Sequence, residues 1–323
     1  MDAIVLDESP LELPLTLASH AAKDGRISTA HLLKGLTWHG ADEPLAAVEM
    51  TTLVLEALFR AHEAAGPGPD DSPATPEHTY RLAGRELPLT PAARAALDRT
   101  VAAAGARPTP VDLLAHLLED EASQAVEVLR LGQVDVPALR TAVAAGRTPD
   151  FVDRVAEPLR PTRDVLIGRT QYGGGGLLGR LKSGLNKVVK MNLARVPVYW
   201  ARSEADAQAH RRGSKRARTD DVILAILATH EVAQRYPFLV QDAADKYGGG
   251  AVLAEAGVTY ASALAAASSA DLGTDAHTID ALAPKGPAFP PDTADLLTRL
   301  IRTPDTRAAR LLDVLGVRNA VGT

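Results

Sequence analysis

The residues most suggestive of chemistry form a glycine-rich run, QYGGGGLLGRLKSGLNK, at positions 171–187. A nucleotide-binding P-loop has the pattern G-x-x-x-x-G-K-[ST]. Its backbone N–H groups wrap the phosphates, its lysine meets the terminal phosphates and its hydroxyl binds magnesium. Here Arg180 replaces the lysine, and Leu181 replaces the hydroxyl and cannot bind a metal. The run therefore indicates a hinge and not an ATP site.

A second candidate for chemistry is the stretch THEVAQ, residues 229–234, which resembles the zinc-protease helix H-E-x-x-H. Gln234 stands where the second histidine is required, so zinc would lack a donor that it needs. His31 lies at the start of a predicted helix, where capping is the expected role. No Ser-His-Asp order and no pair of carboxylates stands out. The sequence thus predicts no catalytic residue, no metal, no cofactor and no enzyme activity.

The composition indicates a helical protein with two domains. The chain has 323 residues, of which 46% are hydrophobic and 4% aromatic, and alanine and leucine are abundant. It has no cysteine, which excludes disulfides and thiolate chemistry. The start, MDAIVLDESP, lacks the pattern of a signal peptide. The apolar run 251–269 contains Glu255 and is interpreted as a helix of a soluble protein. We therefore expect a cytoplasmic protein.

A helical repeat is clearest between Leu89 and Val143. An alanine-rich helix ends near Gly105, a loop with the sequence PTP follows, and the helix VDLLAHLL comes next. Thr109 or Asp112 can cap this second helix by accepting from free backbone N–H groups. The apolar residues of that helix recur at helical spacing and predict a buried face; they are Leu113, Leu114, Leu117 and Leu118.

The same plan recurs three more times, with His31, Asp221 and Asp295 in the position of Asp112. The third copy carries an insertion, QRYPFLVQDAADKYG, and the fourth has a poor first helix. We therefore predict an all-α fold with two domains, each a pseudo-twofold pair of repeats. The first domain spans residues 1–148, with repeats at 11–60 and 87–143. A glycine-rich hinge with the start of a basic helix spans 149–186. The second domain spans 187–323, with repeats at 194–268 and 286–320.

The series [ST]-x-[HD]-L-L-x-x-L followed by A-x-x-L-L-x-x-x-G-V resembles the repeat of the Clp amino-terminal domain. That domain caps Clp-type AAA+ unfoldases and consists of two such repeats. The resemblance implies a double Clp-N protein without the ATPase module. It also implies a non-catalytic adaptor or decoy in Clp proteolysis, which binds peptides, degradation substrates or Clp-targeting cyclic-peptide antibiotics. The implied partners are a Clp unfoldase, its substrates or adaptors, or a peptide-like small molecule.

The resemblance also suggests where a ligand would bind. In some Clp amino-terminal domains an acid in the motif T-E-H helps to hold the guanidinium of phosphorylated arginine. The matching positions are Ala30, Val111, Asp220 and Ala294. Only Asp220 can accept charge-assisted hydrogen bonds, so we expect the first domain to have lost such a pocket. The candidate binding residues are Asp220 and Asp221, with Leu87 and Leu89 at the start of the second repeat.

A basic segment offers an alternative function. Residues 160–218 contain fourteen Lys or Arg and three acids, a net charge of +11; since the whole chain carries −5, the remainder carries −16. Apolar residues at helical spacing from 178 to 196 predict a basic amphipathic helix; its candidate binding residues are Arg180, Lys182, Lys187 and Lys190. This helix could dock on its own domain, or segment 177–218 could bind nucleic acid or a membrane surface. The cluster HRRGSKRAR, 210–218, could contact phosphates or form a solvated loop, and the scarcity of aromatic residues argues against base stacking.

Overall fold

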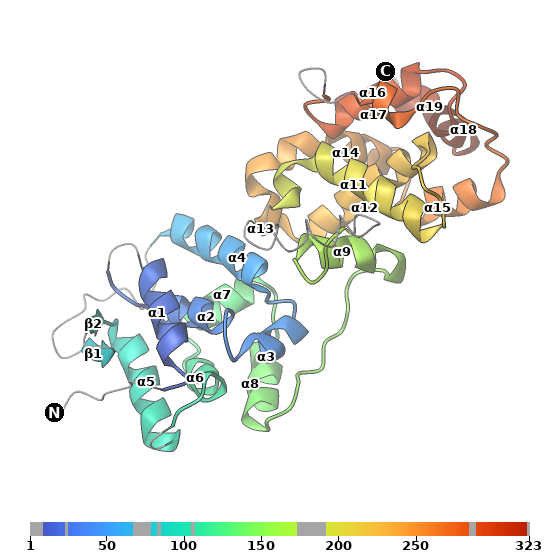
Figure 1. Ribbon diagram of the computed structural model, residues 1–323. Coiled ribbons are helices and arrows are strands. Elements are labelled where there is room, and N and C mark those ends of the chain that lie inside the picture. The colour runs from blue at the N-terminus through green and yellow to red at the C-terminus, as the bar shows by residue number, and fades with distance from the viewer. Residues whose placement is uncertain are drawn as a thin grey trace. The chain divides into compact units, whose positions relative to one another are not determined.

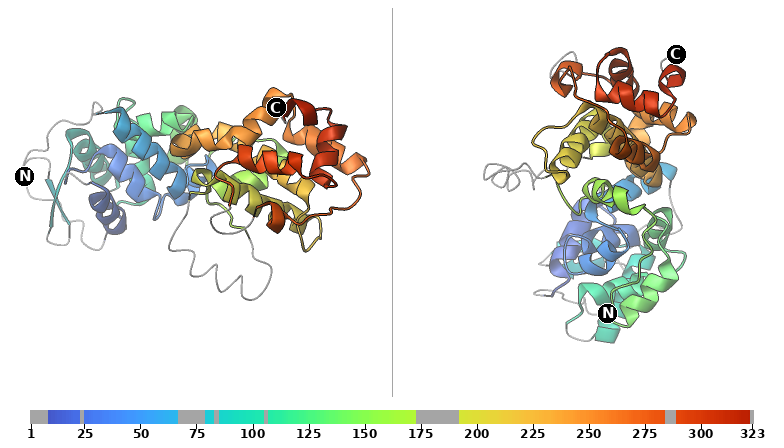
Figure 2. Two further views of the ribbon diagram at one scale, coloured as in Figure 1. Left: turned by 90° about the horizontal axis from the view of Figure 1, so that it is seen from above. Right: turned by 90° about the vertical axis from the view of Figure 1, so that its right-hand side faces the viewer.

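The computed structural model describes residues 9–22, 25–66, 79–82, 85–104, 107–172, 192–283 and 289–321. The chain divides into two units, Met1–Asp153 and Arg154–Thr323, and each is considered separately (Figure 1). The described residues are mostly helical, which confirms the expected all-α character. The views of Figure 2 show each unit as a bundle of short helices.

Unit 1 contains eight described helices and one hairpin, arranged as two successive helical halves. The first half consists of α1 (Glu12–Ala21), α2 (Thr29–Leu36), α3 (Asp42–Ala47) and α4 (Thr52–Ala65). The second half consists of α5 (Pro91–Ala104), α6 (Pro110–Leu117), α7 (Gln124–Leu131) and α8 (Val136–Ala144). The strands β1 (Thr79–Leu82) and β2 (Arg85–Pro88) lie between the halves.

The predicted caps begin the second helix of each half. Thr109 N donates to Asp112 Oδ2 at 2.8 Å and Asp112 N donates to Thr109 Oγ1 at 3.2 Å, a reciprocal capping box. In the first half, Ser28 N donates to His31 Nδ1 at 3.2 Å. The expected capping role of His31 is therefore confirmed, because its ring accepts from an N–H group that the helix itself leaves free.

The core of unit 1 is built from the predicted apolar faces. The four leucines of the α6 segment, 113, 114, 117 and 118, are at most 1% exposed, and burial of each such side chain stabilises the fold by about 1.5–3 kcal/mol. α1 and α2 approach closely at Gly35, where an added Cβ would lie 2.2 Å from the carbonyl oxygen of Pro14. Only glycine fits at this position of α2.

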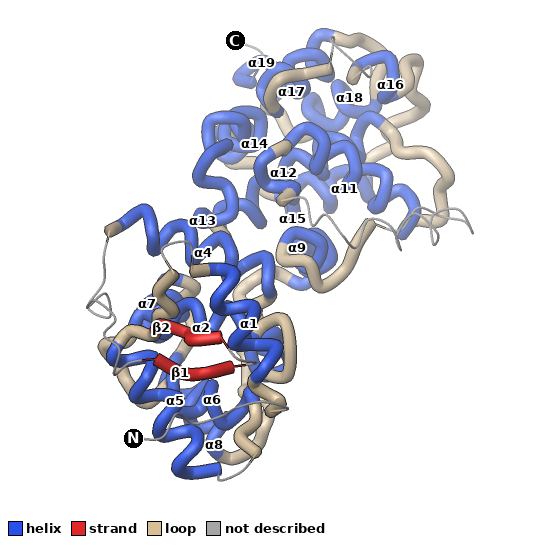
Figure 3. Tube along the Cα trace, turned by 60° about the vertical axis from the view of Figure 1, so that its left-hand side comes forward, coloured by secondary structure: helices blue, strands red, loops and turns tan. Residues whose placement is uncertain are grey.

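The hairpin is the element of unit 1 that the helical patterns did not predict (Figure 3). Its strands are antiparallel, with Tyr80 opposite Leu87. The Tyr80 ring is buried, the Arg94 guanidinium lies 4.3 Å from its centre, and its hydroxyl donates to Asp98 at 2.6 Å. Burial and this hydrogen bond both raise the pKa of Tyr80. The short strands thus pack as part of the helical core.

Unit 2 follows a similar plan with more irregular elements. Its helices include α9 (Arg160–Leu166), α11 (Pro197–Arg211), α12 (Thr219–Arg235), α14 (Gly248–Glu255) and α15 (Tyr260–Ser269). The expected insertion contains α13 (Pro237–Val240) and the 3-10 helix η5 (Gln241–Tyr247). The last part contains α16 (Ile279–Leu282), α17 (Thr293–Arg302), α18 (Arg307–Val314) and α19 (Arg318–Val321), and two further 3-10 helices are η2 (Glu157–Leu159) and η4 (Leu193–Arg195). The four-residue α16 lies before residues 286–320, the predicted bounds of the fourth repeat.

One contact recurs between the halves of both units. In three of the four repeats, the second helix of the repeat begins with a threonine. The hydroxyl of this threonine accepts a hydrogen bond from the backbone N–H of the second residue of a helix in the opposite half. The three pairs are Ala125 N to Thr29 Oγ1 (3.1 Å), Ala308 N to Thr219 Oγ1 (2.9 Å) and Gly249 N to Thr293 Oγ1 (3.0 Å). In the remaining repeat, Pro110 stands in place of the threonine. Its ring lies against Gly40, beside the amino end of α3. The contact satisfies an N–H that a helix start leaves free.

The boundary between the units differs from the expected one. Residues 154–172 were expected in the hinge, but they belong to unit 2. Tyr172 is held there, because its hydroxyl donates to the buried Glu204 at 2.7 Å and accepts from Trp200 Nε1 at 2.9 Å. The next described residue is Asn192, whose side chain donates to the Leu239 carbonyl. From residue 173 onward, the glycine-rich run that was predicted to be a hinge lies outside the described residues.

The predicted basic amphipathic helix lies largely outside the described residues, since 173–191 are not described. Of the described helices, none is by itself long and apolar enough to cross a membrane. One pair, Pro237–Glu255 with Tyr260–Ser269, meets that criterion in length and composition only when taken together, and it is bent by 64°.

Candidate functional site

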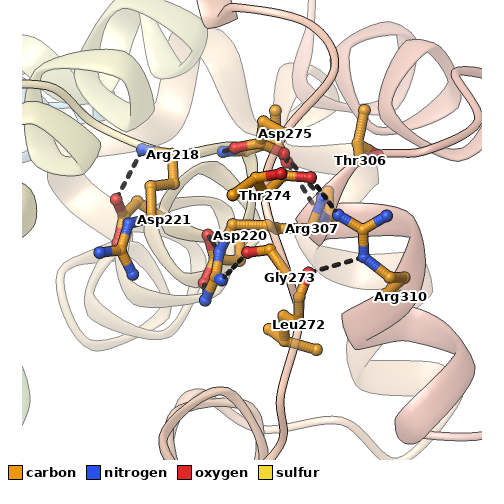
Figure 4. A network of polar contacts seen from close by, with 12 residues as sticks. Arg218, Asp220, Asp221, Leu272, Gly273, Thr274, Asp275, Thr306, Arg307 and Arg310 are labelled. Atoms are coloured by element: carbon orange, nitrogen blue, oxygen red, sulfur yellow. Dashed lines mark hydrogen bonds and ion pairs between the residues drawn. The ribbon is translucent and has the colours of Figure 1, made fainter.

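The predicted site residues Asp220 and Asp221 lie in the first turn of α12, beside the amino end of α18 (Figure 4). Three elements meet here: α12, α18 and the loop that joins α15 to α16. We call residues Leu272–Asp275 of this loop the strap. All of these residues belong to unit 2.

Asp221 is fully used inside the protein. One of its carboxylate oxygens accepts from Arg218 N at 2.7 Å, which caps α12. The same carboxylate forms a bidentate pair with Arg212, in which Nη2 lies 2.8 Å from Oδ2. This hydrogen bonding raises the pKa of Arg212. Asp221 is 0% exposed and therefore stabilises the helix start and the preceding loop, with no oxygen open to a ligand.

Asp220 also has an internal partner. Both of its oxygens accept from Arg307, from Nε and Nη2 at 2.9 Å each, in the fork geometry that guanidinium and carboxylate favour. The hydrogen bond to Asp220 raises the pKa of Arg307. The carboxylate that was expected to accept a ligand guanidinium is thus occupied by a guanidinium of the same chain.

A third carboxylate, Asp275 of the strap, lies between the amino ends of α12 and α18. It accepts from Thr219 N at 2.9 Å, from Thr219 Oγ1 at 2.5 Å and from Arg307 N at 2.7 Å. The free N–H groups and the positive end of each helix dipole favour a negative charge at this position.

The backbone of the strap is held by two arginine side chains. Arg307 Nη1 donates to the Gly273 carbonyl at 2.6 Å (Figure 4). Arg310 donates from Nε to the Leu272 carbonyl at 2.6 Å and from Nη2 to the Thr274 carbonyl at 2.5 Å. Three consecutive carbonyls and one carboxylate are therefore recognised by the two helices. In chemical terms, the two helices hold an internal segment by its backbone carbonyls and by one carboxylate.

Leu87 and Leu89, the candidate residues of unit 1, are buried and not exposed to a partner. Their exposed fractions are 7% and 0%. Leu89 forms a parallel bridge with Ile27, as Ile27 N donates to the Pro88 carbonyl at 2.9 Å. Both leucines therefore position the hairpin in the core.

The basic candidates divide into two groups. Arg180, Lys182, Lys187 and Lys190 lie outside the described residues. The cluster 210–218 covers the end of α11 and the loop to α12, as one of the two interpretations expected. Arg211 pairs with the buried Glu204 at 2.5 Å, and Arg212 pairs with Asp221. These two charges are neutralised within unit 2, so they contribute less to the binding of an anionic partner than the charge of the sequence suggests.

Sequence reasoning missed the residues that complete the site, Asp275, Arg307 and Arg310. Asp275 lies in a loop without periodicity, 56 residues from the helix start that it contacts. Arg307 directly follows the N-cap Thr306, so its position at the start of a helix could be predicted from the sequence. Its partner was not, because 87 residues separate it from Asp220.

The two residues at the histidine positions of the incomplete zinc motif, His230 and Gln234, are joined by a hydrogen bond. Gln234 Nε2 lies 2.9 Å from His230 Nε2, so the amide donates to a neutral imidazole. Burial lowers the pKa of His230. Within the described ranges, no group of three or more His, Cys, Asp or Glu side chains could hold a metal.

Comparisons of the chain with protein-family models, with curated proteins and with solved structures found no match.

Proposed function

We propose that the protein is a non-catalytic binding protein associated with Clp proteolysis. It acts as an adaptor or decoy for peptides, degradation substrates or Clp-targeting cyclic-peptide antibiotics. The observation that carries the proposal is the recurring threonine contact between helical halves, because it joins the same repeats whose sequence resembles the Clp amino-terminal domain. The site at α12 and α18 adds donors suited to peptide carbonyls and a carboxylate.

Exposed aromatic side chains support partner binding, since such residues often anchor protein interfaces. Trp38 of unit 1 is 52% exposed and Tyr199 of unit 2 is 51% exposed. Trp38 follows the end of α2, and Tyr199 lies within α11. Trp38→Ala and Tyr199→Ala therefore test each unit separately.

The deciding experiment is capture from native cytoplasmic extract by the immobilised full-length protein, at low and at high salt, with mass spectrometry of the retained proteins. The proposal expects a Clp unfoldase, its adaptors or its substrates to be retained at high salt, and Trp38→Ala or Tyr199→Ala to reduce that capture. Retention of nucleic acid or lipid alone, lost at high salt, would replace the proposal with the anionic-surface alternative for segment 177–218.

A further inference from the structure

The strap lies on unit 2 in the manner of a bound peptide. Residues 270–278 contain no helix or strand, and within this connection between α15 and α16 Gly273 has a left-handed φ of 59°. Leu272 is 1% exposed, whereas Gly273 and Thr274 are exposed. One apolar side chain is therefore buried, and the two residues after it face solvent.

The groups that bind the strap all come from other elements. Thr219 of α12 and Arg307 and Arg310 of α18 supply donors to its carboxylate and to its three carbonyls. These donors recognise backbone and carboxylate, and the strap presents them with an apolar residue, a glycine in the left-handed conformation directly after it, and an acid two residues after the glycine. A segment of another protein with that pattern can make the same contacts.

The charges of the surface favour an acidic occupant. Asp220 uses Nε and Nη2 of Arg307, and Nη1 of Arg307 is directed to the strap. Arg310 forms no ion pair with an acid in the described part of the chain, and its side-chain hydrogen bonds go to neutral carbonyls. Its positive charge therefore remains uncompensated next to the strap.

We propose that Thr219, Arg307 and Arg310 form a peptide-binding surface that the strap occupies in the free protein. The partner is an acidic segment of another protein, with an apolar residue, a glycine directly after it and an aspartate or glutamate two positions after the glycine, and it competes with the strap. This inference rests on the proposed peptide-binding function and names the partner chemistry for it.

The surface belongs to unit 2 alone. In unit 1 the residue after Thr29 is Ala30, where unit 2 has Asp220 after Thr219. Gln124 occupies the first position of α7, where unit 2 has Arg307 at the first position of α18. Unit 1 therefore lacks both the guanidinium and the acid that orients it, and it serves as an internal comparison.

The test uses the full-length protein and a labelled synthetic peptide with the sequence SADLGTDAHT, residues 269–278. The variant Asp275→Ala releases the carboxylate of the strap. We expect saturable peptide binding to this variant by fluorescence anisotropy, and at least ten-fold weaker binding to the wild type, because the tethered strap competes at high effective concentration. Asp271→Ala is the matched control, since Asp271 is exposed on the same loop and bonds only to Gly273 N; it should behave as the wild type.

Two further controls define the contacts. A peptide with asparagine in the position of Asp275 should bind the released variant at least ten-fold more weakly. Adding Arg310→Ala to Asp275→Ala should abolish binding, whereas adding Arg318→Ala, on α19, should not. Absence of peptide binding to a folded Asp275→Ala protein would overturn the proposal. If a Clp unfoldase were still captured in that case, the binding function would stand and its site would lie elsewhere.

Hydrogen exchange of the wild type tests the same idea without a substitution. The amides of Thr219 and Arg307 donate to Asp275, so they become free when the strap leaves. We expect them to exchange at least ten-fold faster than the amide of Ile226 in the middle of α12. Exchange of all three at one rate, set by global unfolding, would show that the strap does not leave and would overturn the proposal.

Discussion

Asp220 and Arg307 show how a residue selected as a ligand contact can serve the fold instead. Their side chains are 5% and 12% exposed, and they join α12 to α18 across 87 residues of sequence. A carboxylate and a guanidinium removed from water need each other, because an unpaired charge at such a depth is costly. The pair thus fixes the amino ends of two helices and leaves one edge of Arg307 for the strap.

Removing one member of this pair should cost more than removing both. We expect Asp220→Ala to lower the free energy of unfolding of unit 2 by about 3–5 kcal/mol, because Arg307 is left without its acid. Asp220→Ala combined with Arg307→Met should regain more than half of the loss. The measurement is urea unfolding followed by the emission of Trp200 in a Trp38→Phe background, in a double-mutant cycle. Additive losses would contradict a coupled pair.

His230 should make the stability of unit 2 depend on pH. Burial lowers its pKa in the folded state, so the unfolded state binds a proton first as the pH falls. Its contribution to stability is complete above the ordinary pKa of about 6.5 and is lost as the pH falls from there through the lowered folded value. We expect His230→Gln to lose less stability than the wild type between pH 7.5 and pH 5.5 in urea unfolding. Equal losses in both proteins would refute this role.

At the scale of elements, the ends of the helices follow glycine patterns only in part. Gly316 and Gly257 have φ of 71° and 79° and end α18 and α14 with the left-handed residue that favours glycine. After α7, by contrast, the left-handed residue is Gln133, with φ of 59°, and not the neighbouring Gly132. Gly132 instead lies against Met50 and Leu58, where a Cβ would come within 2.9 Å of each side chain.

Gln133 should therefore be a site at which glycine is better than alanine. We expect Gln133→Gly to be more stable than Gln133→Ala by about 1 kcal/mol, because both lack the glutamine side chain and only alanine resists a positive φ. Thermal and urea unfolding of the two variants measure the difference. A less stable glycine variant would mean that backbone entropy outweighs the strain at this turn.

At the scale of the whole molecule, the two units have separate cores and one tryptophan each. Trp38 of unit 1 is exposed, and Trp200 of unit 2 is fully buried. Each core is closed by its own helix contacts, such as α1 against α2 at Gly35 and α14 against α17 at Gly249. This arrangement predicts that a substitution in one core lowers the stability of its own unit and leaves the unfolding transition of the other unit unchanged.

Gly35→Ala tests the independence of the units. The added methyl group would meet the Pro14 carbonyl, so it should destabilise unit 1 by about 1–3 kcal/mol although alanine favours helices. In a Trp38→Phe background, Trp200 emission should report an unchanged transition while circular dichroism shows an earlier one. A shift of both transitions together would show that the units unfold as one.

Much of the helical plan could be predicted from the sequence. The leucine spacing of 113–118, the Thr109–Asp112 cap and the capping role of His31 depend on residues within a few positions of one another. The insertion between α12 and α14 could be recognised because it interrupts a repeat. Local physics decides such features, since periodicity and caps act over one or two helical turns.

Other features depend on contacts that no local pattern encodes. The sequence by itself determined a helical protein with repeated, capped helices and a chain long enough for two units. The tertiary structure decided that residues 154–172 belong to unit 2, that Leu87 and Leu89 are core residues, and that Asp220 faces Arg307 with Asp275 beside it. The contacts of Asp275 and Asp220 join residues 56 and 87 positions apart, and their pairing is selected by the packing of whole helices, which brings charges together only once the core has formed.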